Sequence, residues 1–231
     1  MNKADLKIDW ATHAAAKYAC EHWHYSKCVP AGKLAKIGVW ESTKFVGCVV
    51  FGRGATPNLC KPYGIGQDQC VELVRIALTK HKCAVSRVVA LSIKFLHKSN
   101  PKLRLIVSFA DTSQGHHGGI YQAGNWLYSG QSEKGNFFLV HGKLMHPRSV
   151  ISKGGENSIR GAKKIDPNAT VVVVPGKHRY LMPLDDDMRK KIEPLRKPYP
   201  KRVRSVDSDT STDQVEKGGA SPTRTLQSET M

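Results

Sequence analysis

Ionisable and glycine residues gather between Asp111 and Tyr121, in the run Asp-Thr-Ser-Gln-Gly-His-His-Gly-Gly-Ile-Tyr. This run follows a strand predicted at residues 103–110, and open α/β sheets bind ligands beyond the carboxyl ends of their parallel strands. An Asp or a His there can take a proton from an amine, and Tyr121 can donate one to a leaving group. The pattern predicts a catalytic site of Asp111, His116, His117 and Tyr121. The alternative is a tight turn with a capping Asp and surface histidines.

Histidines alternate with aromatic residues at His22-Trp23-His24-Tyr25, after a short helix predicted at residues 10–20. Aromatic rings can stack on an exposed nucleic-acid base. In an extended segment both histidines would lie on one face, and with Asp111 they could form a metal site of two histidines and one carboxylate. The segment predicts contact with a base or a metal, and the alternatives are a wedge into the core or a surface loop.

A predicted strand-to-helix junction at residues 80–87, Lys-His-Lys-Cys-Ala-Val-Ser-Arg, has the features of a phosphate site. A helix N-terminus presents free amide groups and a partial positive charge. Ser86 suits the N-cap position, and Lys80, Lys82 and Arg87 add charge. No glycine-rich fingerprint accompanies them, so an ordinary capped loop is the alternative.

Two charged residues, Glu72 and Arg75, interrupt an apolar strand predicted at residues 71–78. Charged side chains are rarely buried without a partner. They therefore indicate either a buried ion pair or polar groups that line a cleft.

The apolar pattern predicts a mixed α/β fold. Apolar runs favour strands at 36–41, 44–52, 71–78, 103–110, 126–129, 137–141 and 170–175, the last of them buried. Helical spacing indicates a helix at 86–97, and the glycine-rich stretch 112–125 is expected to hold a short helix. The strand–helix–strand order implies a parallel pair with a right-handed crossover. We therefore expect one domain, residues 1–188, with a mixed central sheet flanked by helices.

The net charge of the 231 residues is +17, and it is unevenly placed. Residues 189–204 hold eight basic residues, one acidic residue and three prolines, which indicates a flexible basic arm. Residues 205–231 hold five acidic and two basic residues in a polar, Ser- and Thr-rich sequence, which predicts a disordered acidic tail. A body this positive favours a polyanion, because each neutralised phosphate releases counterions. Nucleic acid is therefore the predicted partner.

Membrane and secreted classes are disfavoured. The N-terminal sequence MNKADLKIDW lacks the apolar region of a signal peptide, and no apolar run approaches the ~20 residues that span a bilayer. The six cysteines form no C-x-x-C pair. We expect reduced thiols, no membrane partner and a cytoplasmic location.

Several of these segments resemble one family. The run SFADTSQGHHGGIYQAGNWLYSG (108–130), with CVELVRIAL, SRVVALSIKFL and HWHYSK before it, is similar to the Mom family of phage DNA-modification proteins over residues 15–150. That family is similar in fold to GNAT-type acyltransferases. It converts adenine in phage DNA to N6-carbamoylmethyladenine, which protects the genome from host restriction. The resemblance implies a transferase that modifies double-stranded DNA in the cytoplasm of a bacterial host.

The resemblance also assigns residues. It places Glu72 on the central strand and adds it to the catalytic group of Asp111, His116, His117 and Tyr121. The 80–87 junction falls where acyltransferases hold the pyrophosphate of coenzyme A, so acetyl-CoA or another activated acyl donor is expected there, although the usual Arg/Gln-x-x-Gly-x-Gly/Ala sequence is replaced. The expected donor-binding residues are Lys80, Lys82, Ser86 and Arg87. The adenine has to leave the duplex stack, and the expected DNA contacts are His22, Trp23, His24, Tyr25, Lys27, Arg53 and Trp126.

Two other functions use the same features. A GNAT-like acyltransferase acting on tRNA or on a protein amine fits the basic charge equally well. A non-catalytic DNA-binding protein would need neither a carboxylate at a strand end nor adjacent histidines, so the residues disfavour it. An exposed sheet edge could support a homodimer, although nothing in the sequence requires one.

Overall fold

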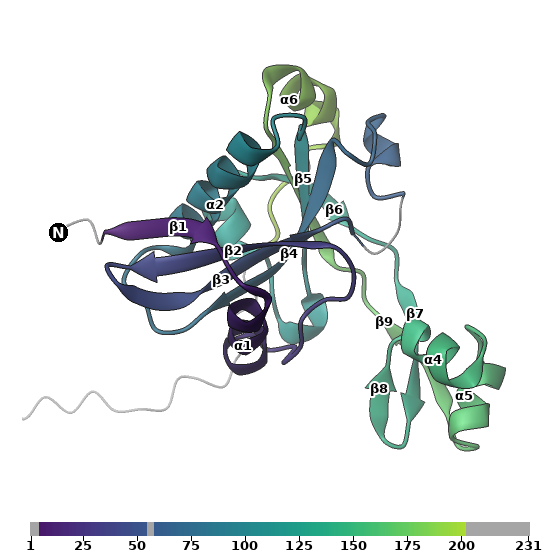
Figure 1. The fold of residues 1–231 in the computed structure, drawn as a ribbon. Coiled ribbons are helices and arrows are strands. Elements are labelled where there is room, and N and C mark those ends of the chain that lie inside the picture. Colours follow the sequence, from purple (N-terminus) through teal and green to yellow (C-terminus); the bar gives the residue numbers. More distant parts are fainter. Residues whose placement is uncertain (1–4, 55–57, 202–231) are drawn as a thin grey trace, which may run out of the picture.

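The computed structural model describes residues 5–54 and 58–201, which form two sheets (Figure 1). The larger sheet has seven strands in the order β1-β2-β3-β4-β5-β10-β6. Only its β4–β5 pair is parallel, and every other neighbouring pair is antiparallel. The predicted mixed sheet with a central strand–helix–strand unit is therefore confirmed. The strands, in spatial order, are Leu6–Trp10, Leu34–Glu41, Lys44–Gly52, Cys70–Leu78, Leu105–Ala110, His178–Pro183 and Leu127–Gln131.

Helices cover both faces of this sheet (Figure 1). Side chains alternate along a strand, so β3 turns Val49 and Phe51 to the core beneath α2 (Val85–Ser99), and turns Cys48 and Val50 to α1 (His13–Trp23). Helix α3 (Gly119–Ala123) packs beside α2, and α6 (Asp186–Ile192) packs over β10. The predicted N-cap at Ser86 is wrong. Helix α2 begins one residue earlier, after Ala84, and has no side-chain cap.

A second, three-stranded sheet lies in a separate small unit between β6 and β10 (Figure 1). Its elements are β7 (Gly135–Val140), β8 (Lys143–Met145), α4 (Pro147–Gly154), α5 (Ile159–Ile165) and β9 (Thr170–Val174). The strand predicted at 170–175 is present, but its expected burial is wrong. Strand β9 lies at an edge of this small sheet, where Val171 is 47% and Val173 is 60% exposed.

The segment 189–204, expected to be a flexible basic arm, is structured as far as residue 201. Its first residues belong to α6, and Glu193–Leu195 form a 3-10 turn. The chain then runs along β6, where Lys197 N–H donates to Tyr128 O at 2.8 Å and Tyr199 O–H donates to Trp126 O at 2.6 Å. These contacts hold the segment against the sheet. The predicted acidic tail, residues 205–231, lies outside the described residues.

Candidate active site

The two central strands separate part-way along their length. Parallel pairing of β4 with β5 runs from Cys70–Leu105 to Leu73–Ser108. At that point β4 also slips against β3, because Val50 pairs with Arg75 while Phe51 pairs with Leu73. Val74 is thus an extra residue of the kind that bends a strand.

A cavity of about 450 Å³ opens where the strands separate. Its lining comes from β4 and β5, from the end of α1 and the turn after it, and from the glycine-rich segment that leads into α3. A volume of this size suits a small organic ligand. The lining residues are Trp23, His24, Tyr25, Val74, Arg75, Ile76, Phe109, Ala110, Gly115, His116, His117, Gly118, Gly119, Ile120 and Tyr121.

Tyr121 lines this cavity and is 8% exposed. Its hydroxyl lies 2.7 Å from the hydroxyl of Ser108, which in turn lies 2.8 Å from the carbonyl oxygen of Leu73. Leu73 is the last residue of β4 that pairs with β5. Burial raises the pKa of Tyr121 to about 12, even though the contact with Ser108 lowers it. Tyr121 is therefore protonated at neutral pH and is held in place at the point of strand separation.

His24 is a neutral hydrogen-bonding group on the cavity wall. Burial, the charge of Arg75 and the proximity of His116 lower its pKa to about 4. Its Nδ1 receives the backbone N–H of Ser26 at 3.1 Å, so Nδ1 is the acceptor and Nε2 carries the proton. His24 can therefore donate a hydrogen bond to a ligand, and it is a poor base at neutral pH.

The two predicted loops meet at the wall of the cavity. The rings of Tyr25 and His116 are 5.2 Å apart and edge-to-face, and Tyr25 also lies against His24 at 4.3 Å. Tyr25 remains 49% exposed, so its ring is open to a flat ligand that enters the cavity.

Among the described residues, Arg75 is the one Lys or Arg side chain that lines the cavity, and none of the lining residues is acidic. One of its terminal nitrogens donates to the carbonyl of Val74 at 2.8 Å. Its Nε is shielded from solvent and has no hydrogen-bond partner in the described part of the chain. This arrangement leaves donor capacity for an anionic or carbonyl oxygen of a ligand. Of the two sequence hypotheses for Arg75, the position in a cleft is confirmed.

Tyr180 holds the glycine-rich segment that lines the cavity through a hydrogen bond to His117. The Tyr180 hydroxyl donates to His117 O at 2.6 Å, and Gln122 Nε2 donates to that hydroxyl at 3.1 Å. Gly118 adopts a φ of +81°, and a Cβ at this position would lie 2.3 Å from the Tyr180 ring. Glycine is therefore required there by both conformation and space.

Asp111 is not among the residues that line the cavity, and both of its carboxylate oxygens already have partners. Its Oδ1 accepts from the backbone N–H and the hydroxyl of Ser113, and its Oδ2 pairs with Lys177 at 3.0 Å. Burial alone would raise the pKa of Asp111, but Ser113 and Lys177 outweigh it and lower the pKa. The geometry gives Asp111 a capping and bracing position, and its expected part as a base stays a prediction.

Other predicted contacts lie elsewhere. His22 belongs to α1, donates to Tyr18 O and stacks on that ring, outside the cavity lining. Trp126 is 1% exposed, so its expected stacking on a base is wrong, because the ring is packed in the core. Lys27 donates to His22 O, and Arg53 is exposed after β3; neither they nor Glu72 line the cavity.

A metal site built from His22, His24 and Asp111 is not assembled. His22 turns to the outside of α1, while His24 lies on the cavity wall. Within residues 5–54 and 58–201, no group of three His, Cys, Asp or Glu side chains could hold a metal ion. No helix in these residues is long and apolar enough to cross a membrane.

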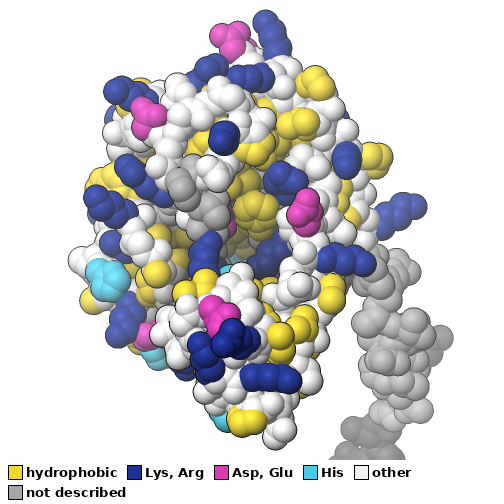
Figure 2. Space-filling model, turned by 90° about the vertical axis from the view of Figure 1, so that its right-hand side faces the viewer, with side chains coloured by type: hydrophobic (Ala, Val, Ile, Leu, Met, Phe, Trp, Pro, Cys, Tyr) yellow, Lys and Arg dark blue, Asp and Glu magenta, His cyan; other side chains and the backbone are white. Residues whose placement is uncertain are grey.

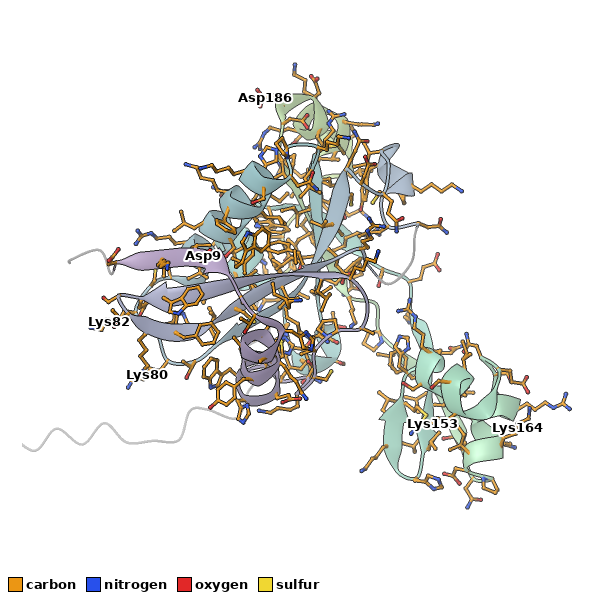
Figure 3. The ribbon with its side chains drawn as sticks, viewed as in Figure 1. Asp9, Lys80, Lys82, Lys153, Lys164 and Asp186 are labelled. Carbon is orange, nitrogen blue, oxygen red and sulfur yellow. The ribbon has the colours of Figure 1, made fainter. Side chains whose placement is uncertain are left out.

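The predicted phosphate junction already holds an anion. The carboxylate of Glu41, at the end of β2, accepts from Lys82 N–H at 2.9 Å and from Cys83 N–H at 2.7 Å. The backbone hydrogen bonds from Lys82 and Cys83 lower the pKa of Glu41. Figure 3 shows Lys80 and Lys82 at the far end of the sheet from the small unit. The junction as it stands therefore does not fit the pyrophosphate of coenzyme A.

The family model for the Mom protein family matches residues 5–201. The chain belongs to the Mom family. It is 24% identical over 206 residues to "Methylcarbamoylase mom" of Escherichia phage Mu, covering 85% of this chain and 84% of that protein. The predicted family is thereby confirmed.

Among solved structures, this Mom family member is similar to an acetyltransferase from Acinetobacter baylyi ADP1, with a TM-score of 0.42 and 12% identity, covering 80% of this chain and 95% of the other. It is also similar to an agmatine N-acetyltransferase mutant in the apo form, with a TM-score of 0.39 and 8% identity, covering 78% of this chain and all of the other.

Sequence reasoning on this Mom family member missed three residues that shape the site. Glu41 and Lys177 occur in ordinary charged contexts, so neither their residue type nor their spacing sets them apart. Tyr180 belongs to β10, which was not predicted because His178, Arg179 and Pro183 interrupt its apolar character. Gly118, by contrast, carried a signal, since a Gly-Gly pair after two histidines indicates an unusual backbone turn.

Proposed function

We propose that this Mom family member is a transferase that places a carbamoylmethyl group on N6 of adenine in phage DNA and so protects that DNA from host restriction. The family match supports the reaction class. The observation that carries the assignment is the cavity at the β4–β5 separation, with its aromatic and imidazole walls, one guanidinium and no carboxylate. The net charge of +17 supports a polyanionic substrate.

The cavity can receive an adenine that has left the duplex. Base-modifying enzymes extrude the target base and hold it by stacking and by hydrogen bonds. Tyr25 is the half-exposed ring suited to stacking, and the Nε2–H of His24 can donate to a ring nitrogen of the base. Trp23 lines the same side of the cavity and limits the position of the base.

Transfer requires that N6 lose a proton as it forms a bond to carbon. His116 lines the cavity in edge-to-face contact with Tyr25, beside the ring on which the base would stack, and its imidazole is the group proposed to take this proton. His117 carries the carbonyl that Tyr180 holds, which fixes the loop on which both histidines lie. Tyr121, protonated and held by Ser108, is placed to donate a proton to the group that leaves.

The donor is the second substrate of this transfer. The fold family implies an acyl-CoA, but Glu41 fills the junction where its pyrophosphate would lie. Arg75 provides the remaining recognition in the cavity and suits a carbonyl or anionic oxygen of the donor.

Mass spectrometry of nucleosides tests the function. Plasmid DNA is isolated from cells that express the wild type, His116→Ala or Asp111→Ala, and folding of each variant is checked by circular dichroism. We expect an adenosine with the added mass of a carbamoylmethyl group in the wild type and its loss in His116→Ala. Unmodified DNA from cells with folded wild-type protein would reject the proposal.

The same experiment decides the alternative. If the new nucleoside appears in tRNA, or if a protein amine carries the added mass while DNA does not, the chain is a GNAT-like acyltransferase with another acceptor. The lining of the cavity does not discriminate between DNA, tRNA and protein amines, so all three are analysed in the same experiment.

A further inference from the structure

The small unit is an insertion between two strands that already pair. Strands β6 and β10 are antiparallel neighbours in the large sheet. At their ends, Ser132 N–H donates to Lys177 O at 2.9 Å and Lys177 N–H donates to Ser132 Oγ at 3.0 Å. A hairpin of this kind is commonly closed by two to five residues. The insertion is therefore not needed to complete the large sheet.

The inserted unit, residues 135–174, has a core of its own. Phe138, Val140, Val150, Ala162 and Ala169 form one buried cluster to which the large sheet contributes no buried residue. Its two helices cross closely, since a Cβ on Gly154 would lie 2.1 Å from the carbonyl oxygen of Gly161. The outer surface of this insert unit is thus free for a role outside folding.

The insert unit leaves the body beside the cavity. Thr112 Oγ donates to Gly176 O at 3.1 Å, and Lys177 pairs with Asp111. His178, the first residue of β10, pairs with Ala110, which lines the cavity. A large substrate that inserts one group into the cavity would therefore extend past the insert unit.

The outer face of α5 is basic. Arg160, Lys163 and Lys164 are exposed and lie three and four residues apart, on one side of the helix. Figure 2, which faces the side where the insert unit projects, shows Lys and Arg side chains on this unit and beside the hollow above it. Figure 3 labels Lys164 on α5 and Lys153 on α4, both on the insert unit.

The acidic residues of the insert unit are occupied internally. Asp166 is 9% exposed and accepts from the backbone N–H groups of His141 and Asn168. Glu156 accepts from Ser158 and pairs with Lys164 at 3.2 Å. Among the described residues, neither Arg160 nor Lys163 has an ion pair. These two cations are therefore available to an external anion.

We propose that the insert unit is a clamp that binds the sugar–phosphate backbone of duplex DNA next to the target base, through the basic face of α5. This inference rests on the proposed function for its substrate. Removing a base from the stack requires a few kcal/mol, and phosphate contacts on the insert unit hold the duplex while the base is outside it. Such contacts position the DNA without reading its sequence.

The test compares Arg160→Gln/Lys163→Gln with Lys94→Gln/Lys98→Gln. The second pair lies on the exposed face of α2, so both double variants remove two exposed helical cations and leave every core residue in place. Binding of a labelled duplex is measured by fluorescence anisotropy across a range of salt concentrations. Each lost phosphate contact lowers the slope of log affinity against log salt by about 0.9.

We expect the α5 variant to lower that slope by about 2 and the affinity by about tenfold, while the α2 variant behaves like the wild type. Equal slopes for the two variants would overturn the clamp. Tighter wild-type binding of tRNA than of the duplex, lost in the α5 variant, would also overturn it by assigning the surface to RNA.

Binding and modification are measured separately, so the two proposals can fail separately. If the wild type modifies no DNA but only the α5 variant loses the salt slope, the clamp holds and the proposed function fails. If DNA is modified and the α5 variant keeps both its slope and its affinity, the function holds and the clamp fails.

Discussion

Replacing Glu41 tests whether this carboxylate occupies the place of a donor phosphate. In the wild type, Glu41 accepts from two backbone amides before α2, at 2.7 to 3.0 Å. A ligand phosphate could use these amides only by displacing the side chain. Glu41→Ala removes the competitor and leaves the amides in place, so it should weaken folding and strengthen phosphate binding by related amounts.

The contacts give the magnitude. Hydrogen bonds to a charged acceptor contribute about 1.5–3 kcal/mol, and the partly exposed position of Glu41 reduces that contribution. We expect Glu41→Ala to lose about 1–2 kcal/mol of unfolding free energy, or about 2–8 °C in Tm for a chain of this size. The same free energy corresponds to an increase of about 5–30-fold in the affinity for coenzyme A.

Calorimetric titration with coenzyme A, inorganic pyrophosphate and pantetheine measures this effect. Pantetheine lacks the pyrophosphate, so its affinity should be the same in both proteins. Glu21→Ala is the control, because Glu21 forms a 3.8 Å surface ion pair with Lys17, and such pairs contribute about 0–1 kcal/mol. Equal affinity of wild type and Glu41→Ala for coenzyme A, with Tm lowered as expected, would refute the idea that Glu41 competes with a phosphate.

Three further predictions concern the cavity. The pKa of His24 in the folded protein, about 4, lies below its usual 6.5, so between these values the unfolded chain binds more protons and the free energy of unfolding should decrease as the pH is lowered. Denaturant unfolding at pH 7 and at pH 5 measures this decrease, which His24→Gln should reduce by about 1–2 kcal/mol. Tyr121→Phe should slow DNA modification by about 10²–10⁴-fold while unfolding free energy drops by about 1 kcal/mol; a rate close to that of the wild type would remove Tyr121 from the mechanism. In Arg75→Met, the pKa of His24 should rise toward its usual value in an NMR titration, because one of the charges that lower it is gone, and DNA modification should be lost. An unchanged titration would show that the charge of Arg75 does not lower this pKa.

The central part of the fold could be predicted because its periodicity is unambiguous. The apolar spacing of α2 and the continuous runs of β4 and β5 indicate a parallel pair, and Ser42 and Thr43 mark the hairpin between β2 and β3. The insert unit could not be recognised, because its helices are only eight and seven residues long and polar on most of their surface. The Val-rich β9 reads as a buried strand from composition, and only its position at a sheet edge exposes it.

The site was predictable residue by residue but not as an arrangement. The residue types around His24 and His116 indicated contact with a ligand, and the fold brings their two loops together at the wall of the cavity. Glu41 and Lys82 are far apart in sequence, so no local pattern indicates that the carboxylate accepts from the Lys82 amide. This contact follows only from the pairing of β2 with its neighbouring strands. Trp126 shows the opposite limit, since an aromatic residue in a glycine-rich segment reads equally well as a stacking platform and as part of the core.

The cavity also restricts the chemical class of the donor. Its lining includes the guanidinium of Arg75 and no carboxylate. A sulfonium donor would bring a second positive charge beside this guanidinium, and unpaired like charges at close range oppose binding by several kcal/mol. A donor in which the transferred carbon is joined to a neutral or anionic leaving group avoids this penalty, and its carbonyl oxygen can accept from the guanidinium of Arg75. Because the protonated Tyr121 lines the same cavity, a leaving group that departs with an electron pair could take a proton from it. The charge of the described lining therefore disfavours an onium donor.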